Sequence, residues 1–320
     1  MKYPEYLINE YKKKLFKSNE LPFKINTVCE EAKCPNRGEC FSKKTVTFLL
    51  LGNTCTRSCL YCNVKKGEPP PLDSSEGDNI VKAIQLFNLK YVVLTSVTRD
   101  DLDDGGAIGF VRVIKKIKEY DPKIKIEVLT PDFKDNITAL DTILEQEPYV
   151  FNHNLEIVPS IFSQLRPQGN FELSLNLLQY VKKNYPHIKV KTGIMVGLGE
   201  TKSEVVDLIH LLAAKTNSTP KANSTQNDFS AKQQVMSNLK STDSRFPIPD
   251  SPNYIENHFA KSIDAITIGQ YLQPNKKLAK INRFVAPDEF AKYINIGNQL
   301  GIKIIAGPLV RSSYLADEAF

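Results

Sequence analysis

The chain has 320 residues and an ordinary composition, 41% hydrophobic and 24% charged, with a formal net charge of +6. This length suits one large α/β domain or two small ones, and the lack of any run of about eighteen apolar residues excludes a membrane-spanning helix. The modest positive charge suits an acidic protein partner or nucleic acid, but no nucleic-acid-binding motif accompanies it, so we expect no nucleic acid partner.

The beginning of the chain carries no recognisable targeting signal. Its first residues, MKYPEYLINEYKKK, lack both an apolar signal core and the Arg- and Ser-rich composition of a transit peptide. We therefore expect a cytoplasmic protein, or a protein of an organelle matrix if a presequence has been removed.

All six cysteines lie between residues 29 and 62. A disulfide framework spreads its cysteines along a small secreted domain, whereas cysteines crowded into one stretch of a large chain indicate metal ligands. They form two trios, which are Cys29, Cys34 and Cys40, followed by Cys55, Cys59 and Cys62.

From residue 45 onward, short apolar runs alternate with amphipathic segments. The runs predict strands buried on both faces at 45–52, 90–97, 123–130, 149–158, 188–197, 263–272 and 301–307. The apolar spacing between them predicts helices at 78–89, 106–120, 136–146, 172–184, 202–214 and 287–300. Asp78 is the expected N-cap of the first helix, and Gly105 and Gly106 are expected to open the second. Strands that alternate with helices form a parallel sheet, and six or seven such units predict a barrel or partial barrel, whose chemistry lies at the C-terminal ends of its strands.

The run from Thr216 to Pro252 breaks this alternation. It is dominated by Ser, Thr, Asn and Gln and lacks the apolar density of a barrel unit. We expect a mobile surface insertion at about 216–257 with a short helix near 230–240. A lid or a partner-docking element is the alternative.

The trio Cys55, Cys59 and Cys62 has the spacing C-x3-C-x2-C and follows the first expected strand. Iron–sulfur and zinc sites usually have four ligands. Three thiolates from one loop would therefore leave the fourth iron of a cubane open to an outside ligand. Half of a zinc site is the alternative, but this spacing matches no common zinc knuckle.

This motif resembles that of the radical S-adenosylmethionine superfamily. The resemblance implies an α/β fold, a partial (β/α)6-type TIM barrel, in which the open iron of a [4Fe-4S] cluster binds S-adenosylmethionine. The reduced cluster then splits that molecule into methionine and a 5′-deoxyadenosyl radical. Tyr61 matches the aromatic residue that usually precedes the last cysteine and packs near the adenine.

The second trio restricts the resemblance to one family within this superfamily. Its segment TVCEEAKCPNRGECF (27–41), with the spacing C-x4-C-x5-C, and LGNTCTRSCLYCNV (51–64) together closely resemble the lipoyl synthase family. The resemblance continues in TSVTRDDLDDGGA (95–107), VFNHNLEIV (150–158), RPQGNFELSL (166–175), KTGIMVGLGET (191–201), TIGQYLQP (267–274) and AGPLVRSSYLADE (306–318). It covers roughly residues 22–214 and 262–318 in the same order.

The family resemblance implies a sulfurtransferase with two [4Fe-4S] clusters. Its substrate is an octanoyl group attached to a lysine of a lipoyl carrier domain, and two S-adenosylmethionine molecules drive insertion of sulfur at carbons 6 and 8. Cys29, Cys34 and Cys40 hold an auxiliary cluster that donates the sulfur, and Ser313 of the R-S-S-Y segment is its fourth ligand. A serine oxygen is less well matched to iron than a thiolate, so this ligand could be displaced when the cluster gives up sulfide.

Polar residues at the expected strand ends are candidate contacts for S-adenosylmethionine. Asn154 and Glu156 could hold its ribose hydroxyls or amino group, and Arg166 could pair with its carboxylate. Gly197 and Gly199 would let the backbone approach the adenine or ribose. Each is also compatible with barrel packing or a turn, and we expect His153 to be a core residue.

The resemblance also implies the domains and partners. Residues 1–44 form an N-terminal extension with the auxiliary cysteines, 45–307 the barrel with its insertion, and 308–320 a C-terminal segment. The chain has no Trp, and KYPEYL (2–7) is expected to stand in for the longer N-terminal segment usual in the family. Expected partners are octanoylated carriers (the glycine cleavage H protein and the E2 subunits of 2-oxoacid dehydrogenases), a ferredoxin or flavodoxin as reductant, and an iron–sulfur carrier for cluster repair. We expect a monomer.

Two other functions stay open on the sequence. One is a different radical sulfurtransferase similar to biotin synthase, which would lack C-x4-C-x5-C upstream of the main motif. The other is a two-cluster electron carrier, which would want four cysteines for each cluster and no barrel.

Overall fold

The computed structural model describes residues 3–7, 25–32, 34, 36, 39–40, 45–213, 263–314 and 316–320. Seven of its strands form one parallel sheet in which their spatial order is also their order in the chain. They are β1 (Val46–Leu50), β4 (Tyr91–Ser96), β5 (Lys125–Leu129), β6 (Val150–Asn152), β7 (Lys189–Val196), β8 (Ala265–Gln270) and β9 (Lys303–Gly307). The polar insertion expected at about 216–257 lies outside the described residues.

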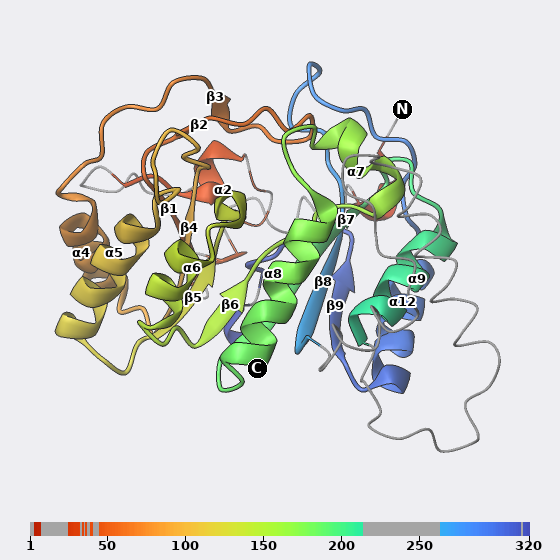
Figure 1. Cartoon of the computed structure of the whole chain (residues 1–320). Coiled ribbons are helices and arrows are strands. Elements are labelled where there is room, and N and C mark those ends of the chain that lie inside the picture. Colours follow the sequence, from red (N-terminus) through yellow and green to blue (C-terminus); the bar gives the residue numbers. More distant parts are fainter. Residues whose placement is uncertain are drawn as a thin grey trace.

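A helical segment follows each of the first six strands. The helices are α4 (Glu76–Phe87), α5 (Ala107–Tyr120), α6 (Ile137–Leu144), α7 (Pro159–Leu165), α8 (Phe171–Asn184), α9 (Lys202–Ala213) and α12 (Pro287–Leu300). They lie around the outer side of the curved sheet, from α4 and α5 at one end to α9 and α12 at the other (Figure 1). Six strand–helix units followed by a seventh strand confirm the partial barrel. None of the helices in the described residues is both long and apolar enough to cross a membrane.

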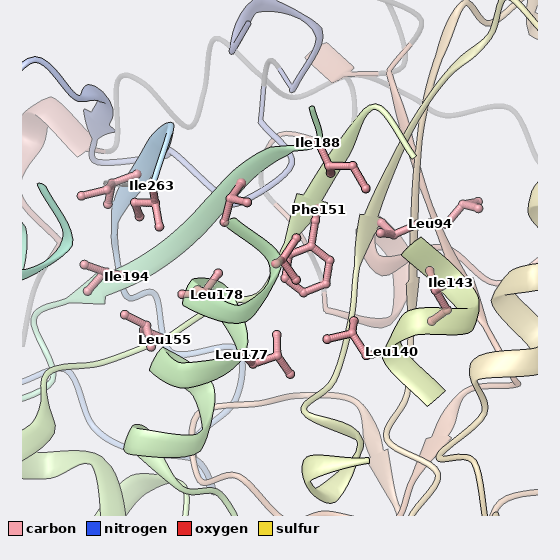
Figure 2. Close-up of a cluster of buried hydrophobic side chains, with 14 of the residues drawn as sticks. Leu94, Leu140, Ile143, Phe151, Leu155, Leu177, Leu178, Ile188, Ile194 and Ile263 are labelled. Carbon is pink, nitrogen blue, oxygen red and sulfur yellow. The ribbon is translucent and has the colours of Figure 1, made fainter. Parts of the chain in front are cut away.

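The core lies between the sheet and its covering helices. Phe151 of β6 is fully buried, and side chains of α6 and α8 surround it (Figure 2). The central strands are buried on both faces, as their continuous apolar runs predict. β9, at one edge of the sheet, is half-exposed instead, whereas β1 at the other edge is buried.

Two details differ from the sequence-based expectations. Asp78 is not an N-cap, since α4 begins two residues earlier after Ser75, and the carboxylate of Glu76 in its first turn accepts a hydrogen bond of 2.9 Å from the backbone N–H of Leu51. The expected strand at 149–158 is also too long, because pairing stops at Asn152 and returns only as a single bridge between Glu156 and Ile194.

The reason for the short strand is local backbone geometry. Glu156 has a φ of +72°, a left-handed conformation that a continuous strand cannot contain. Helix α7, which the sequence pattern did not predict, begins shortly afterwards with Pro159 in its first turn, a position where the missing N–H of proline costs nothing. The expected start of α5 is confirmed, with Gly106 as its N-cap.

The N-terminal and C-terminal segments meet where the sheet ends. Thr27 pairs with Phe48 of β1 in an antiparallel bridge, and short helix α2 (Val28–Glu31) follows directly. Beyond β9, the carbonyl of Leu309 accepts a hydrogen bond of 2.5 Å from the buried amide of Asn36. These contacts bring the cysteine-rich extension and the last residues of the chain to the same side of the barrel.

A buried ion pair lies inside the barrel. Lys191 Nζ of β7 is 2.6 Å from Glu127 Oε1 of β5, and both side chains are fully buried. Tyr91 and Asn152 also donate hydrogen bonds to the Glu127 carboxylate, at 2.8 and 2.9 Å. Because a buried charge is costly without its partner, the pair ties β5 to β7 across β6.

We expect Lys191→Met to lower the free energy of unfolding by about 3 kcal/mol or more, since it leaves the Glu127 carboxylate buried without its cation. The matched control is Lys90→Met, which removes an exposed lysine 3.5 Å from Asp121 and should cost less than about 1 kcal/mol. Anaerobic urea denaturation measures both. Equal losses for the two variants would contradict the role given to the buried pair.

Candidate active site

The loop that carries the first trio leaves the C-terminal end of β1. Leu51 and Gly52 turn the chain there with positive φ values of 67° and 93°. Cys55 lies on the short strand β2 (Thr54–Cys55), which pairs in parallel with β3 (Lys65–Lys66). Backbone hydrogen bonds then anchor the loop, because Thr56 donates to Thr98 after β4 and Leu60 donates to Leu165 of α7.

A buried arginine inside the motif anchors this loop through hydrogen bonds to two carboxylates. Arg57 donates two hydrogen bonds to the carboxylate of Asp132 at 2.6 and 2.7 Å, and two to that of Asp100 at 2.8 and 3.0 Å. Burial opposes ionisation of Asp132, but the hydrogen bonds and charge of Arg57 lower its pKa to about 2. Sequence reasoning missed this network, although an Arg between two ligand cysteines and an Asp just after β5 were visible signals.

The three thiols of the first trio lie close enough to interact electrostatically. Burial raises the pKa of Cys59, and it raises that of Cys62 to about 11, with neighbouring cysteines adding to both shifts. Cys59 and Cys62 therefore favour the protonated thiol, and a cationic centre would supply the charge that holds them as thiolates. Tyr61, which precedes Cys62 in the sequence, is buried. Both Tyr61 and Cys62 line a central cavity that the second trio also lines.

Three of the residues predicted to contact S-adenosylmethionine lie beside the first trio. The Asn154 amide donates a hydrogen bond of 3.2 Å to Glu156 Oε1, and burial raises the pKa of Glu156, which the charge of Arg166 opposes. Arg166 also interacts electrostatically with Cys59, so it lies near both the trio and Glu156. Its Nη1 is buried without a hydrogen-bond partner among the described residues, while its Nη2 is 3.6 Å from Asp132.

The other two predicted contacts lie apart from this group. Gly197 and Gly199 follow β7 with φ values of 97° and 128°, and they are not among the residues that line the central cavity. A side chain at Gly197 would collide with Gln270, whereas the space beside Gly199 is open. Their glycine identity thus follows from the turn, and a contact with a cofactor stays a prediction.

His153, which we expected in the core, is 1% exposed there. Its Nδ1 lies 2.9 Å from the carbonyl of Thr130, and burial lowers its pKa to about 4.

The second trio lies across the barrel opening, against the C-terminal segment. A side-chain hydrogen bond between Cys29 and Cys34, together with burial, raises the pKa of Cys29, and the charge of Cys40 adds to the shift. Arg311 lies close enough to Cys34 for the two side chains to interact electrostatically. The hydroxyl of Tyr314 donates to the carboxylate of Glu39, next to Cys40, at 3.1 and 3.2 Å.

One cavity of about 810 Å³ joins the two trios. Its wall combines the second trio, the end of the first and the R-S-S-Y segment with the C-terminal halves of β7 and β8. The residues that matter here are Cys29, Cys34, Cys40, Tyr61, Cys62, Asn154, Glu156, Arg311, Ser312, Ser313 and Tyr314. Cys55, Cys59 and Arg166 are not among the residues that line this cavity. The volume is in the range of cavities that hold a small-molecule cofactor or substrate.

N-terminal residues that sequence reasoning assigned only loosely also reach this cavity. Tyr3 and Leu7 line it, and the ring of Tyr3 lies 5.3 Å from that of Phe284. The hydroxyl of Tyr6 donates to the carbonyl of Val285 at 2.7 Å. Residues 3–7 therefore pack over the mouth of the barrel.

The donor set suits two iron–sulfur clusters better than a single metal ion. Among the described residues, no three His, Cys, Asp or Glu side chains converge to hold one ion. A cubane instead takes each thiolate on a separate iron. Two trios of mutually interacting thiols, and an arginine nitrogen left unpaired beside one of them, fit two clusters and an anionic ligand.

Comparisons with known proteins agree with this geometry. The model of the Radical SAM superfamily matches residues 49–212. Lipoyl synthase of Caldanaerobacter subterraneus subsp. tengcongensis is 42% identical over 92% of this chain and 87% of its own length. Lipoyl synthase of Caldicellulosiruptor saccharolyticus is 41% identical over the same shares of the two chains.

A solved structure shares the fold. Streptococcus suis SuiB bound to S-adenosylmethionine matches with a TM-score of 0.50 and 9% identity, over 84% of this chain and 53% of the SuiB chain. Identity near 40% over nearly the whole chain goes further than a shared fold. The chain therefore belongs to the lipoyl synthase family of the radical S-adenosylmethionine superfamily.

Proposed function

We propose a division of roles between the two trios of this lipoyl synthase. The enzyme inserts sulfur at carbons 6 and 8 of an octanoyl group carried on a lysine of a lipoyl carrier domain. The observation that carries the division is the cavity of about 810 Å³, which is lined by the whole second trio, by Ser313 and, from the first trio, by Cys62. An acyl chain that enters this cavity can lie between the two trios.

Cys55, Cys59 and Cys62 hold the cluster that binds S-adenosylmethionine. When bound there, the cluster and S-adenosylmethionine would supply the radical chemistry needed to remove hydrogen from an unactivated carbon of the acyl chain. The protein contributes the orientation of its ligands. Arg57 holds the loop through Asp100 and Asp132, which are on two further strand ends, so the positions of the thiols are set by the barrel.

The neighbouring polar residues bind S-adenosylmethionine itself. The unpaired Nη1 of Arg166 is available for a carboxylate, which is the anion that guanidinium groups bind best in a buried site. Glu156 and Asn154 present an acid and an amide to the amino group and ribose. Tyr61 packs on the adenine, and Gly197 and Gly199 allow the backbone to approach it.

Cys29, Cys34, Cys40 and Ser313 bind the second cluster, which is consumed as the sulfur donor and is in that sense a substrate. All four residues line the cavity. An alkoxide is a weaker match to iron than a thiolate, so Ser313 is the ligand that can leave when sulfide is given up. The hydrogen bonds of Asn36 and Tyr314 hold the two chain segments together meanwhile.

The protein substrates are lipoyl carrier domains. We infer that these are the octanoylated glycine cleavage H protein and E2 subunits of 2-oxoacid dehydrogenases. The reductant is a ferredoxin or flavodoxin, and an iron–sulfur carrier rebuilds the second cluster. The enzyme acts as a monomer in the cytoplasm, with the 1–44 extension and the 308–320 segment as additions to the barrel of residues 45–307.

Anaerobic reconstitution tests this function directly. We expect about eight irons per chain, four for each cluster, formation of 5′-deoxyadenosine, and a mass increase for two sulfurs on a carrier peptide with an octanoyl-lysine. About four irons, or a peptide whose mass stays unchanged while deoxyadenosine forms, would refute the assignment of the second trio.

Ser313→Ala should separate the two half-reactions. It removes the proposed oxygen ligand of the second cluster but no group of the first, so cleavage of S-adenosylmethionine should stay detectable while sulfur insertion falls by at least about ten-fold. Measurement of 5′-deoxyadenosine and thiolated peptide in one anaerobic assay shows both. Normal sulfur insertion would mean that Ser313 is not a ligand.

Arg57→Lys should impair the first trio. Lysine keeps the charge but cannot make the two paired hydrogen bonds to each carboxylate, so the loop shifts, and we expect cleavage of S-adenosylmethionine to fall by about ten-fold or more. The matched control is Arg112→Lys, on the exposed face of α5, which should leave the rate unchanged. Iron content measured alongside reveals whether the cluster is lost or only misplaced.

A further inference from the structure

Three side chains from distant parts of the chain form a hydrogen-bonded row in the cavity. The hydroxyl of Ser312 donates to Asn154 Oδ1 at 2.8 Å. The amide nitrogen of Asn154 in turn donates to Glu156 Oε1 at 3.2 Å. Residues 312 and 154 are separated by most of the barrel in sequence, yet both line the cavity between the trios.

A glycine leaves the space that the contact between Ser312 and Asn154 needs. Gly193 of β7 lies beneath it, and a Cβ there would be 2.5 Å from Ser312 Oγ and 2.7 Å from Asn154 Oδ1. Such distances are far inside van der Waals contact, so a side chain at this position would force the two residues apart. The backbone φ of Gly193 is not in the left-handed region, which means that space, rather than turn geometry, requires the glycine.

Ser312 anchors one end of the Asn154 amide. An amide has one oxygen that accepts and one nitrogen that donates. The carboxylate of Glu156 accepts, so the Asn154 nitrogen lies on its side, and the oxygen faces Ser312, whose hydroxyl donates to it. Without that hydroxyl, the oxygen end of the amide loses the hydrogen bond that holds it in place. Glu156 itself stands on a left-handed residue, a strained conformation of the kind that marks functional positions.

We infer that Ser312 is a positioning residue that couples the auxiliary-cluster segment to the pocket for S-adenosylmethionine. Its neighbour Ser313 is the proposed ligand of the second cluster, so a bound cluster holds Ser312 in place, and Ser312 in turn holds Asn154 in the position from which it donates to Glu156. Coupling between two sites is reciprocal. The second cluster and S-adenosylmethionine therefore each strengthen the binding of the other. The inference rests on the proposed function.

The test is a double-mutant cycle that compares four proteins. They are the wild type, Ser312→Ala, the triple variant in which Cys29, Cys34 and Cys40 are alanine, and the combination of both changes. Each is reconstituted anaerobically. The dissociation constant for S-adenosylmethionine is measured by the change in the electron paramagnetic resonance signal of the reduced first cluster, and iron content is determined in parallel.

Loss of one hydrogen bond should weaken binding of S-adenosylmethionine by about three- to ten-fold in Ser312→Ala, with about eight irons retained. Removal of the second cluster should weaken binding similarly in the wild-type background and have no further effect when residue 312 is alanine. Gly193→Ala should reproduce the Ser312→Ala result, because it separates the same two groups. Ser75→Ala, which removes an exposed hydroxyl before α4, should change nothing.

The outcomes separate the inference from the function beneath it. An unchanged affinity in Ser312→Ala overturns the positioning role. An equal effect of cluster removal with and without the Ser312 hydroxyl overturns the coupling. If the wild type itself neither holds about eight irons nor binds S-adenosylmethionine, the proposed function fails, and the inference fails with it.

Discussion

The closing of the barrel opening by the two ends of the chain is the constraint on which the rest of the structure depends. The parallel sheet has two edges, β1 and β9, and the segments that precede and follow them meet through the buried hydrogen bond between Asn36 and Leu309. Because of this contact, three cysteines from the N-terminal extension and a serine from the C-terminal segment face one cavity. Neither segment could form a four-ligand site by itself.

The two trios are held in different ways, and the difference matches their proposed chemistry. The first loop is tied to the ends of several strands through Arg57 and its two carboxylates, so its thiols are positioned by the rigid barrel. The second trio depends on contacts between chain ends, such as that of Tyr314 with Glu39. A site that must keep its cofactor benefits from the former arrangement, and a site that must release sulfur and be rebuilt benefits from the latter.

Much of the fold could be predicted from the sequence, and so could the two groups of cysteines that we propose as cluster ligands. Strand–helix alternation predicts a parallel barrel, since continuous apolar runs fit only strands buried on both faces. Cysteine spacing identifies the two trios because ligands from a single loop are local in sequence. The sequence pattern failed at Glu156, where a strained residue ends β6 early, and at Asp78, where a tertiary hydrogen bond from Leu51 to Glu76 set the start of the helix instead.

The sequence by itself therefore determined the alternation of strands and helices, the family and which residues we propose to bind iron. Only the tertiary structure decided that Arg57 reaches Asp132, that Arg166 keeps one nitrogen unpaired, and that Ser312 meets Asn154 over Gly193. The physical reason is that periodicity and spacing report interactions within a few residues. Contacts between residues far apart in sequence depend on how the sheet curves and on where the chain ends pack, and no local pattern records either.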